Sequence, residues 1–312
     1  MLSMQGALIL DKAAGVTSHD VVARARRITG ERRIGHTGTL DPFATGVLVL
    51  LVGAATRLGQ FLAGAEKEYE AIFRLGFDTD TGDSTGTKIE SPARAQSPRR
   101  FGKEEIEAAL AALRGTILQT PPMYSAKKIG GRKLYEFARK GVEVERNPIR
   151  VNILEFEALT SDDLTLEKDN TVDLPVRVVC SAGTYIRTLA EDFGKQLRVG
   201  AHVGELRRTR AGRFTAEHAI TIERLTELAA DGALAQILIS PDETISHLPS
   251  VQLSEADVID IRHGIDLRIG ETDSWSDGQF VRLRNKNGNL IAVGRHSRSE
   301  SSVHPQVVIA EE

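Results

Sequence analysis

A single carboxylate inside a loop of small residues is the feature that most constrains this chain. Residues 35–46 read GHTGTLDPFATG, in which seven of the twelve residues are Gly, Thr or Pro. Such residues set individual backbone torsions and leave no helical or strand period, so the segment predicts a loop. The run VLVLLVG at 47–53 follows directly and has the length and β-branching of a buried strand. The sequence therefore places Asp41 on a loop that leads into the core.

Asp41 alone does not define a functional site. An Asp before a proline ordinarily forms a turn by accepting hydrogen bonds from nearby N–H groups, and that alternative stays open here. GERRIGHT (30–37) has the spacing of a phosphate-binding loop, but His36 replaces its lysine. An aspartyl nucleophile of the phosphatase type would need a second Asp where Phe43 stands. DTDTGDSTG (78–86) is similar to a calcium loop, but two ligand positions lack oxygen donors, so a structural turn is the better interpretation.

Composition limits the class of protein. A chain of 312 residues with 41% apolar and 27% charged residues is typical of a soluble protein of about two domains. The start MLSMQGALILDK lacks the basic and long apolar regions of a signal peptide, and no apolar run is long enough to span a bilayer. The one cysteine, Cys180, excludes an internal disulfide framework and a cysteine-rich zinc site. We therefore expect a cytoplasmic protein with no membrane contact.

The distribution of charge points to a polyanionic partner, although the net charge of −3 alone argues against one. Four clusters hold 23 of the 40 Lys and Arg residues, and they span residues 24–33, 127–150, 198–213 and 282–298. Residues 254–277 instead hold seven acids against two arginines. A solvated surface would explain one basic cluster, but four clusters balanced by acids elsewhere favour a nucleic-acid interface.

The pattern of elements predicts an α+β fold, because strands and helices alternate too irregularly for a doubly wound sheet. Strands are expected near residues 7–10, 47–53, 69–76 and 176–180. A helix capped by Ser18 should end at Gly30, a second should cover 103–115, and a third should end at Gly194. After about residue 248, short apolar segments alternate with turns, and Asn287-Gly288 predicts a hairpin. We therefore expect two domains, 1–247 and 248–312, joined by 241–250.

Six segments in order along the chain carry a family resemblance. They are DKAAGVTS, GHTGTLDPFATGVLVLLVGAATRL, EKEYEAIFRLGFDTDTGDSTG, PPMYSAKKIGGRKLYEFARKG, VVCSAGTYIRTLAEDFG and AHVGELRRTRAGRF. Together they resemble the motifs of the TruB family of tRNA pseudouridine-55 synthases, from about residue 7 to 215. Two positions depart from the family pattern: Ala13 stands where proline is common, and Phe43 where leucine is common. Neither departure removes a reactive group.

The resemblance implies a pseudouridine-synthase fold, with a mixed and largely antiparallel sheet flanked by helices and loops. It also implies an RNA-binding insertion at about 124–151 and a small β-rich, PUA-like RNA-binding domain at 248–312. The implied reaction breaks the N-glycosidic bond of a uridine, rotates the uracil and joins its carbon 5 to the ribose. Atoms are neither gained nor lost, so we expect no cofactor and no metal. One carboxylate suffices, either as nucleophile on the sugar or as base at its 2′ position.

The same resemblance assigns roles to residues. Asp41 is the expected catalytic aspartate, Tyr69 would stack on the uracil, and Arg187 would hold Asp41 ionised. Three further side chains would bind the extruded nucleotide or line its pocket: Tyr185, Leu206 and His36. Contacts to the RNA backbone are expected from Lys127, Lys128, Arg132, Lys133, Arg207 and Arg208. Alternatives stay open: Tyr69 as an ordinary strand aromatic, Arg187 as a phosphate clamp, and Lys12 as a structural or phosphate-facing residue.

The expected partner is tRNA, bound through its T-arm stem-loop by a monomer without a guide RNA. The target uridine is stacked in that loop, so the enzyme must flip it out. Guide-dependent relatives share the Asp41 loop, but the resemblance implies that they lack the long insertion. A non-catalytic RNA-binding module and a hydrolytic glycosylase are further alternatives, although the latter would need a pair of carboxylates.

Overall fold

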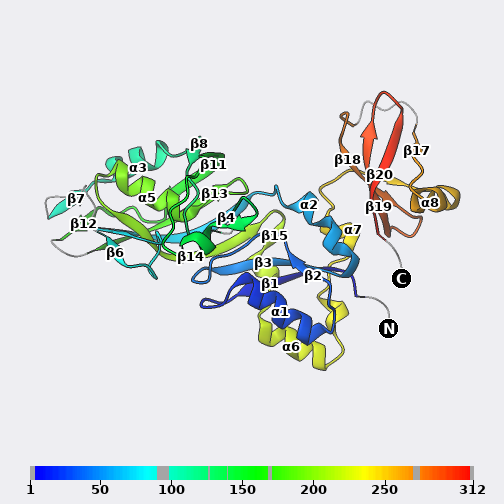
Figure 1. The fold of residues 1–312 in the computed structure, drawn as a ribbon, viewed down its shortest axis with the longest axis horizontal. Helices are drawn as coiled ribbons and strands as arrows, with labels where there is room; N and C mark the ends of the chain where they lie inside the picture. Colours follow the sequence, from blue (N-terminus) through cyan, green and yellow to red (C-terminus); the bar gives the residue numbers. More distant parts are fainter. Residues whose placement is uncertain are drawn as a thin grey trace.

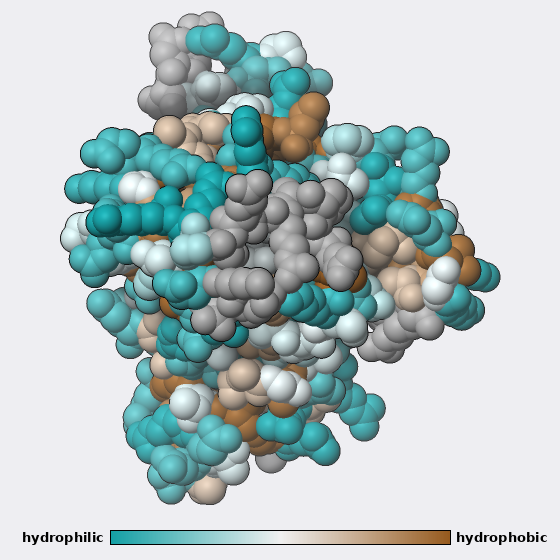
Figure 2. Space-filling model, turned by 90° about the vertical axis from the view of Figure 1, so that its left-hand side faces the viewer, coloured by the Kyte–Doolittle hydropathy of each residue, from teal (hydrophilic) through white to brown (hydrophobic). Residues whose placement is uncertain are grey.

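The computed structural model describes residues 4–89, 98–125, 127–138, 140–167, 171–269 and 275–309. A nine-stranded sheet forms the larger part of the molecule, and a five-stranded sheet lies at the other end of its long axis (Figure 1). The end far from the five-stranded sheet is largely hydrophilic, and its apolar areas are interrupted by hydrophilic residues (Figure 2). Within the described ranges, no helix is long and apolar enough to cross a membrane.

The large sheet is mixed and mostly antiparallel, which confirms the predicted fold class. Its main strands, in spatial order, are β1 (Gly6–Lys12), β3 (Thr45–Val52), β14 (Ala201–Ala211), β4 (Lys67–Leu75), β13 (Val172–Cys180), β11 (Ile149–Ala158) and β8 (Gly115–Gln119). β2 (Ile34–His36) pairs with β3, and β15 (Phe214–Thr215) pairs with β14. The β3–β14 pair is parallel, and the other pairings in this sheet are antiparallel. That parallel pair brings the loop before β3 beside β14.

Short elements and helices complete the larger part. Three two-stranded ribbons are β5 (Asp78–Thr79) with β6 (Lys88–Ile89), β7 (Arg99–Phe101) with β12 (Leu164–Leu166), and β9 (Lys128–Ile129) with β10 (Arg132–Lys133). The α-helices are α1 (Ser18–Thr29), α2 (Gly59–Leu62), α3 (Lys103–Ala111), α4 (Leu134–Ala138), α5 (Ile186–Gln196), α6 (Ile222–Ala230) and α7 (Pro241–Thr244). Three 3-10 helices are η1 (Gly53–Leu58), η2 (Ala216–His218) and η3 (Leu234–Gln236).

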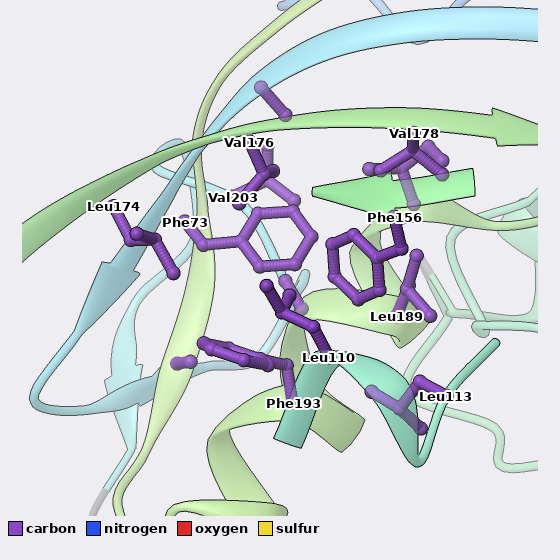
Figure 3. Packing of buried hydrophobic residues seen from close by; sticks show 14 of the residues in the cluster. Phe73, Leu110, Leu113, Phe156, Leu174, Val176, Val178, Leu189, Phe193 and Val203 are labelled. Atoms are coloured by element: carbon purple, nitrogen blue, oxygen red, sulfur yellow. The ribbon is translucent and has the colours of Figure 1, made fainter. Parts of the chain in front are cut away.

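The main core lies between one face of the large sheet and the helices α3 and α5. Every second residue of β4 is buried in it, from Tyr69 to Leu75, as the period of two in a strand requires. Phe73 packs against Phe156 and Phe193, with ring centroids 5.7 and 5.9 Å apart (Figure 3). Because Tyr69 is the first buried residue of β4, its side chain lies at the margin of this core.

Helix α1 begins one residue earlier than the sequence predicts. Its N-cap is Thr17, which forms a capping box with Asp20, so the prediction that Ser18 caps the helix is wrong. Ser18 is 1% exposed, and its hydroxyl bonds both the N–H and the carbonyl of Leu40. The helix ends at Gly30 in the left-handed conformation, as predicted. Ser18 therefore fastens the start of α1 to the Asp41 loop.

Helix α5 continues past Gly194, where the sequence predicts its end. A Cβ at Gly194 would lie 2.6 Å from the Cβ of Ala201, so this position needs glycine for close packing of α5 against β14. The prediction was wrong because a glycine that permits a close approach is indistinguishable in sequence from one that ends a helix.

The five-stranded sheet follows the order β16 (Ser250–Gln252), β18 (Phe280–Arg284), β19 (Leu290–Ser297), β20 (Ser302–Val308) and β17 (Leu267–Arg268), with α8 (Glu255–Arg262) beside it. The predicted hairpin at Asn287-Gly288 is confirmed, since it joins β18 and β19. Phe280 packs edge-on against Phe61 of α2. Arg282 is 8% exposed and pairs with Asp242 at 2.7 Å. This contact fastens the 241–250 segment to the sheet and occupies one arginine of the C-terminal basic cluster.

Candidate active site

Asp41 lies beside a cavity of about 280 Å³ at the margin of the main core. Of the six residues predicted to be catalytic or to bind the nucleotide, five line this cavity: Asp41, Tyr69, Tyr185, Arg187 and Leu206. They come from the loop before β3, from β4, from the start of α5 and from β14. The sheet topology therefore brings together side chains that lie up to 165 positions apart in the sequence.

Lys12 supports the loop that carries Asp41 through hydrogen bonds to backbone carbonyls. The Lys12 ammonium donates to the carbonyls of Ala13, Val16 and Pro42 at 2.9, 2.8 and 3.1 Å. The residue is 1% exposed, and burial lowers its pKa to about 8. Of the two alternatives for Lys12, the structural one fits, because a phosphate cannot reach an ammonium enclosed by three carbonyls.

Arg208 supports the same loop from β14. Its guanidinium donates to the carbonyls of Val47, Gly38 and Thr39 at 2.7, 3.1 and 3.4 Å, and the residue is 1% exposed. A Cβ at Gly46 would lie 2.2 Å from the Arg208 carbonyl oxygen, so only glycine permits this approach. Arg208 also lines the cavity, and its contact to the RNA backbone, which stays a prediction, would have to be made beside these three bonds.

Arg207 points to the opposite face of β14 from Arg208. It forms a bidentate pair with Asp11 at 2.7 and 3.0 Å, and its side chain is 40% exposed. The predicted contact between Arg207 and the RNA backbone would have to compete with this pair. Both arginines at 207–208 therefore form hydrogen bonds within the protein.

Arg187 and Asp41 form the central ion pair of the cavity. Arg187 Nε lies 2.9 Å from Asp41 Oδ2, and the two Nη atoms donate to the carbonyls of Thr81 and Tyr124 at 2.8 and 2.6 Å. The Arg187 side chain is 4% exposed, against 32% for Asp41. All three guanidinium nitrogens are thus occupied, which disfavours the alternative of a phosphate clamp. Of the two partners, the Asp41 carboxylate is the one that remains accessible from the cavity.

Two opposing effects act on the Asp41 carboxyl group. Burial raises its pKa, and the positive charge and hydrogen bond of Arg187 counter that rise. The nearby Asp83 adds to the rise, while Lys12 opposes it. Asp41 therefore depends on Arg187 to remain ionised inside the cavity.

Asp83 belongs to this cluster of charges, and the sequence analysis did not single it out. Its Oδ2 lies 3.7 Å from Arg187 Nη1, and its Oδ1 accepts from the Thr81 hydroxyl and from the N–H and hydroxyl of Thr85. The 78–86 segment is thus a turn, as expected, but a turn that braces Arg187 through Asp83 and the Thr81 carbonyl. The density of Asp, Thr and Gly directly after β4 was the available signal. Among the described residues, no His, Cys, Asp and Glu cluster could hold a metal ion.

The apolar walls of the cavity come from two neighbouring strands. Tyr69 is 6% exposed and Leu206 7% exposed, and β4 and β14 pair so that Leu206 is opposite Ala71. Burial raises the pKa of the Tyr69 phenol, so this side chain is neutral at physiological pH. Tyr185 is the N-cap of α5, and burial raises the pKa of its phenol as well.

The remaining predicted residues lie around the cavity or beyond the described side chains. His36 sits on β2, packs edge-to-face on His19 at 5.4 Å, and does not belong to the described cavity lining. Lys127 lines the cavity, and Arg132 is exposed. Lys128 and Lys133 belong to the β9–β10 ribbon, but their side chains fall outside the described part of the structure.

Comparisons with known proteins agree with this geometry. The model of the TruB family pseudouridylate synthase N-terminal domain matches residues 26–186, and that of the tRNA pseudouridylate synthase B C-terminal domain matches 187–246. The tRNA pseudouridine synthase B of Heliobacterium modesticaldum is 42% identical over 299 residues, which is 96% of this chain and 93% of that protein. Its counterpart in Geobacillus thermodenitrificans is 44% identical over 302 residues, 97% and 98% of the two chains.

Two solved structures share the fold over nearly the whole chain. The archaeal box H/ACA sRNP Nop10–Cbf5 complex matches with a TM-score of 0.71 and 26% identity, over 98% of this chain and 86% of that chain. An H/ACA RNP bound to a substrate RNA containing 2′-deoxyuridine gives 0.70 and 27%, over 98% and 85%. The fold and the cavity together are those of a pseudouridine synthase, an isomerase of RNA. Within that class, the chain belongs to the TruB family of tRNA pseudouridine synthases.

Proposed function

We propose that this chain converts uridine-55 in the T loop of tRNA to pseudouridine, with Asp41 as the reactive carboxylate. The observation that carries the proposal is the ion pair between Asp41 and Arg187, at 2.9 Å, in a cavity walled by Tyr69 and Leu206. The pair leaves the carboxylate partly exposed to the cavity, while the guanidinium is enclosed. This is the arrangement that a reaction needing one ionised, oriented carboxylate requires.

Asp41 begins the reaction at the sugar of the bound uridine. Attack on carbon 1′ and removal of the 2′ proton both need an ionised carboxylate, and Arg187 favours that form. The N-glycosidic bond breaks, the uracil turns within the cavity, and carbon 5 forms the new bond to carbon 1′. The proton on carbon 5 then leaves and the freed nitrogen N1 takes up a proton, so the product is an isomer of the substrate. The apolar walls keep water from the intermediate, which prevents loss of the base by hydrolysis.

Base flipping precedes this chemistry, because a stacked uridine cannot reach the cavity. Unstacking costs a few kcal/mol. Stacking of the flipped uracil on Tyr69 returns about 1–3 kcal/mol, and Leu206 from the neighbouring strand adds apolar lining to the cavity. His36, near the Asp41 loop on β2, is proposed to contact the RNA around the extruded nucleotide.

The tRNA is bound beyond the cavity by two further parts of the chain. The insertion at about 124–151 reaches the cavity through Lys127, and its basic composition suits the phosphates of the T arm. The five-stranded C-terminal sheet is proposed to act as a PUA-like RNA-binding domain on the acceptor stem. The insertion supports action by a monomer without a guide RNA, and a tRNA substrate implies a cytoplasmic location.

The proposal is tested on an isolated T-arm stem-loop, with no cofactor, metal or guide RNA added. We expect stoichiometric conversion of one uridine to pseudouridine, and no conversion when that position carries cytidine. Release of free uracil would identify a hydrolytic glycosylase instead. Binding without conversion would identify a non-catalytic RNA-binding module, and conversion that needs an added guide RNA would identify a guide-dependent enzyme.

The insertion makes a separate prediction about salt dependence. Replacing Lys127, Lys128, Arg132 and Lys133 with Ala removes up to four cations that can pair with phosphates. The slope of log affinity against log salt should then shrink by about 0.7–0.9 for each phosphate that is no longer neutralised. The matched control replaces Lys103 and Lys195, which are exposed on α3 and α5, and should leave the slope unchanged. An unchanged slope in the fourfold variant would mean that the T arm binds elsewhere.

A further inference from the structure

A buried glutamine joins β8 to the start of α5. Gln119 is the last residue of β8 and is 0% exposed. Its Oε1 accepts from the Tyr185 N–H at 3.0 Å, and its Nε2 donates to the Tyr185 carbonyl at 3.3 Å. An amide buried in an apolar core is tolerated only when its donors and acceptors are paired, and here both partners are backbone groups of one residue.

That residue determines where α5 begins. Tyr185 is the N-cap of the helix, and its own side chain makes no capping hydrogen bond. The first N–H groups of a helix have no partner within the helix, so an external acceptor fixes their position. Gln119 provides that acceptor two residues before Arg187. The place from which the Arg187 side chain projects therefore depends on the Gln119 amide.

Two more hydrogen bonds connect the same two segments. The Thr188 hydroxyl donates to the Thr120 carbonyl at 3.5 Å, and Arg187 Nη2 donates to the Tyr124 carbonyl at 2.6 Å. Residues 119–125, which lead from β8 into the basic insertion, are thus fastened to the start of α5 at three points. The Gln119 amide bonds only to the Tyr185 backbone. These two bonds connect it neither to a side chain that lines the cavity nor to the Asp41 carboxylate.

We infer that Gln119 is a positioning residue for the Asp41–Arg187 pair, acting through the Tyr185 backbone. The inference rests on the proposed function, because it concerns the reaction that this pair performs. Loss of the amide leaves the Tyr185 N–H unpaired, while the Tyr185 carbonyl keeps only its bond from the Leu189 N–H, and it frees the start of α5 to shift. A shift moves the Arg187 guanidinium relative to Asp41, and a displacement of about 1 Å can cost up to about 100-fold in rate.

The pH profile reports this displacement because Asp41 must be ionised to react. The charged and titratable groups around Asp41 are Arg187, Asp83, Lys12, Tyr69 and Tyr185, and the cations Lys67, Lys127 and Arg208 also line the cavity. Of these, Arg187 is the strongest influence that lowers the pKa of Asp41. If Arg187 moves away, the pKa of Asp41 rises further. The rate then begins to fall at a higher pH as the solution is acidified.

The test uses Gln119→Met, which keeps the size and removes both hydrogen bonds. Single-turnover rates on the T-arm stem-loop are measured across the pH range together with the dissociation constant. We expect a rate roughly 10- to 100-fold lower at neutral pH, an acid limb displaced to higher pH, and an RNA affinity within about twofold of wild type. A role confined to folding would lower the amount of active protein equally at every pH and leave the limb in place.

Two further variants keep the test decisive. Thr244→Val removes a buried side chain-to-backbone hydrogen bond in α7, far from the cavity, and should not move the acid limb. Gln119→Glu keeps the acceptor for the Tyr185 N–H, and its carboxyl group, when protonated, also donates to the Tyr185 carbonyl. This variant should fold even if Gln119→Met does not. At acidic pH, where its carboxyl group is protonated, it should keep most of the rate that the wild-type protein has at the same pH.

The outcomes separate the inference from the function on which it rests. A wild-type protein that converts no uridine would overturn the proposed function. A wild-type protein that is active, with an acid limb unchanged in Gln119→Met, would overturn the positioning role alone. If Gln119→Met does not fold, a Gln119→Glu protein that folds but loses its rate at every pH would have the same consequence.

Discussion

Asp41→Asn is expected to abolish isomerisation while tRNA binding stays close to wild type. The amide keeps the shape of the side chain and can still accept a hydrogen bond from Arg187 Nε, but it carries no charge and is neither nucleophile nor base. A single essential group removed from an active site typically costs a factor on the order of 10³ or more in rate. The affinity should survive, because the basic residues that attract the phosphates are unchanged.

The measurement compares pseudouridine formation with binding of the T-arm stem-loop for the same preparations. The control is Asp163→Asn, the same change at an exposed carboxylate that pairs with Arg100 on the surface, and it should behave as wild type. Turnover by Asp41→Asn at a rate near that of wild type would remove Asp41 from the chemistry. A loss of binding equal to the loss of turnover would make Asp41 a binding residue only.

Much of the fold was predictable because local patterns and burial agree in this chain. The Asp41 loop combines turn-forming residues with an apolar strand that follows at once, and both were found where expected. The period of two in β4 fixed which of its residues enter the core. Asn287-Gly288 has the backbone freedom that a hairpin needs, and the hairpin formed there.

The sequence shows which side chains are charged, but it does not show which face of the sheet each one points to. Arg207 and Arg208 were both expected to contact RNA because both are cationic. A strand sends neighbours to opposite faces, so Arg208 turns inward to three loop carbonyls while Arg207 turns outward to Asp11. The charge of a residue is visible in the sequence, but the partner that neutralises it is set by sheet register.

The partners of Arg187 show the same limit more strongly. Its pairing with Asp41 was expected from the family resemblance. Its contacts with Asp83, with the Thr81 carbonyl and with the Tyr124 carbonyl join segments separated by 63 to 106 positions, and no local pattern predicts them. Backbone carbonyls in particular have no signature in a sequence. The support of the active site is therefore a property of the tertiary structure.

Arg187→Met should cost both activity and stability, because it removes the buried cation that the Asp41 and Asp83 carboxylates share. Asp41 and Asp83 then repel each other with only the smaller influence of Lys12 on Asp41 to oppose it, and the Thr81 and Tyr124 carbonyls lose their donors. Breaking a buried ion pair from one side costs about 3–5 kcal/mol of the free energy of unfolding. We expect a loss of about 3 kcal/mol, since the Asp41 side chain is 32% exposed, and a rate lower by about 100-fold or more.

The stability deficit of Arg187→Met should shrink as the pH falls. Burial already raises the pKa of Asp41, and without Arg187 nothing comparable opposes that rise. A carboxyl whose pKa is higher in the folded than in the unfolded state stabilises the fold below the unfolded value, which is about 3.9 for Asp, and loses this contribution as the pH rises through the folded value. Denaturant unfolding at acidic and neutral pH measures the change.

Arg74→Met, which breaks an exposed pair with Asp173, serves as the control, with a deficit of at most about 1 kcal/mol. A deficit in Arg187→Met that is the same at both pH values would attribute the loss to packing and not to the uncompensated carboxylates.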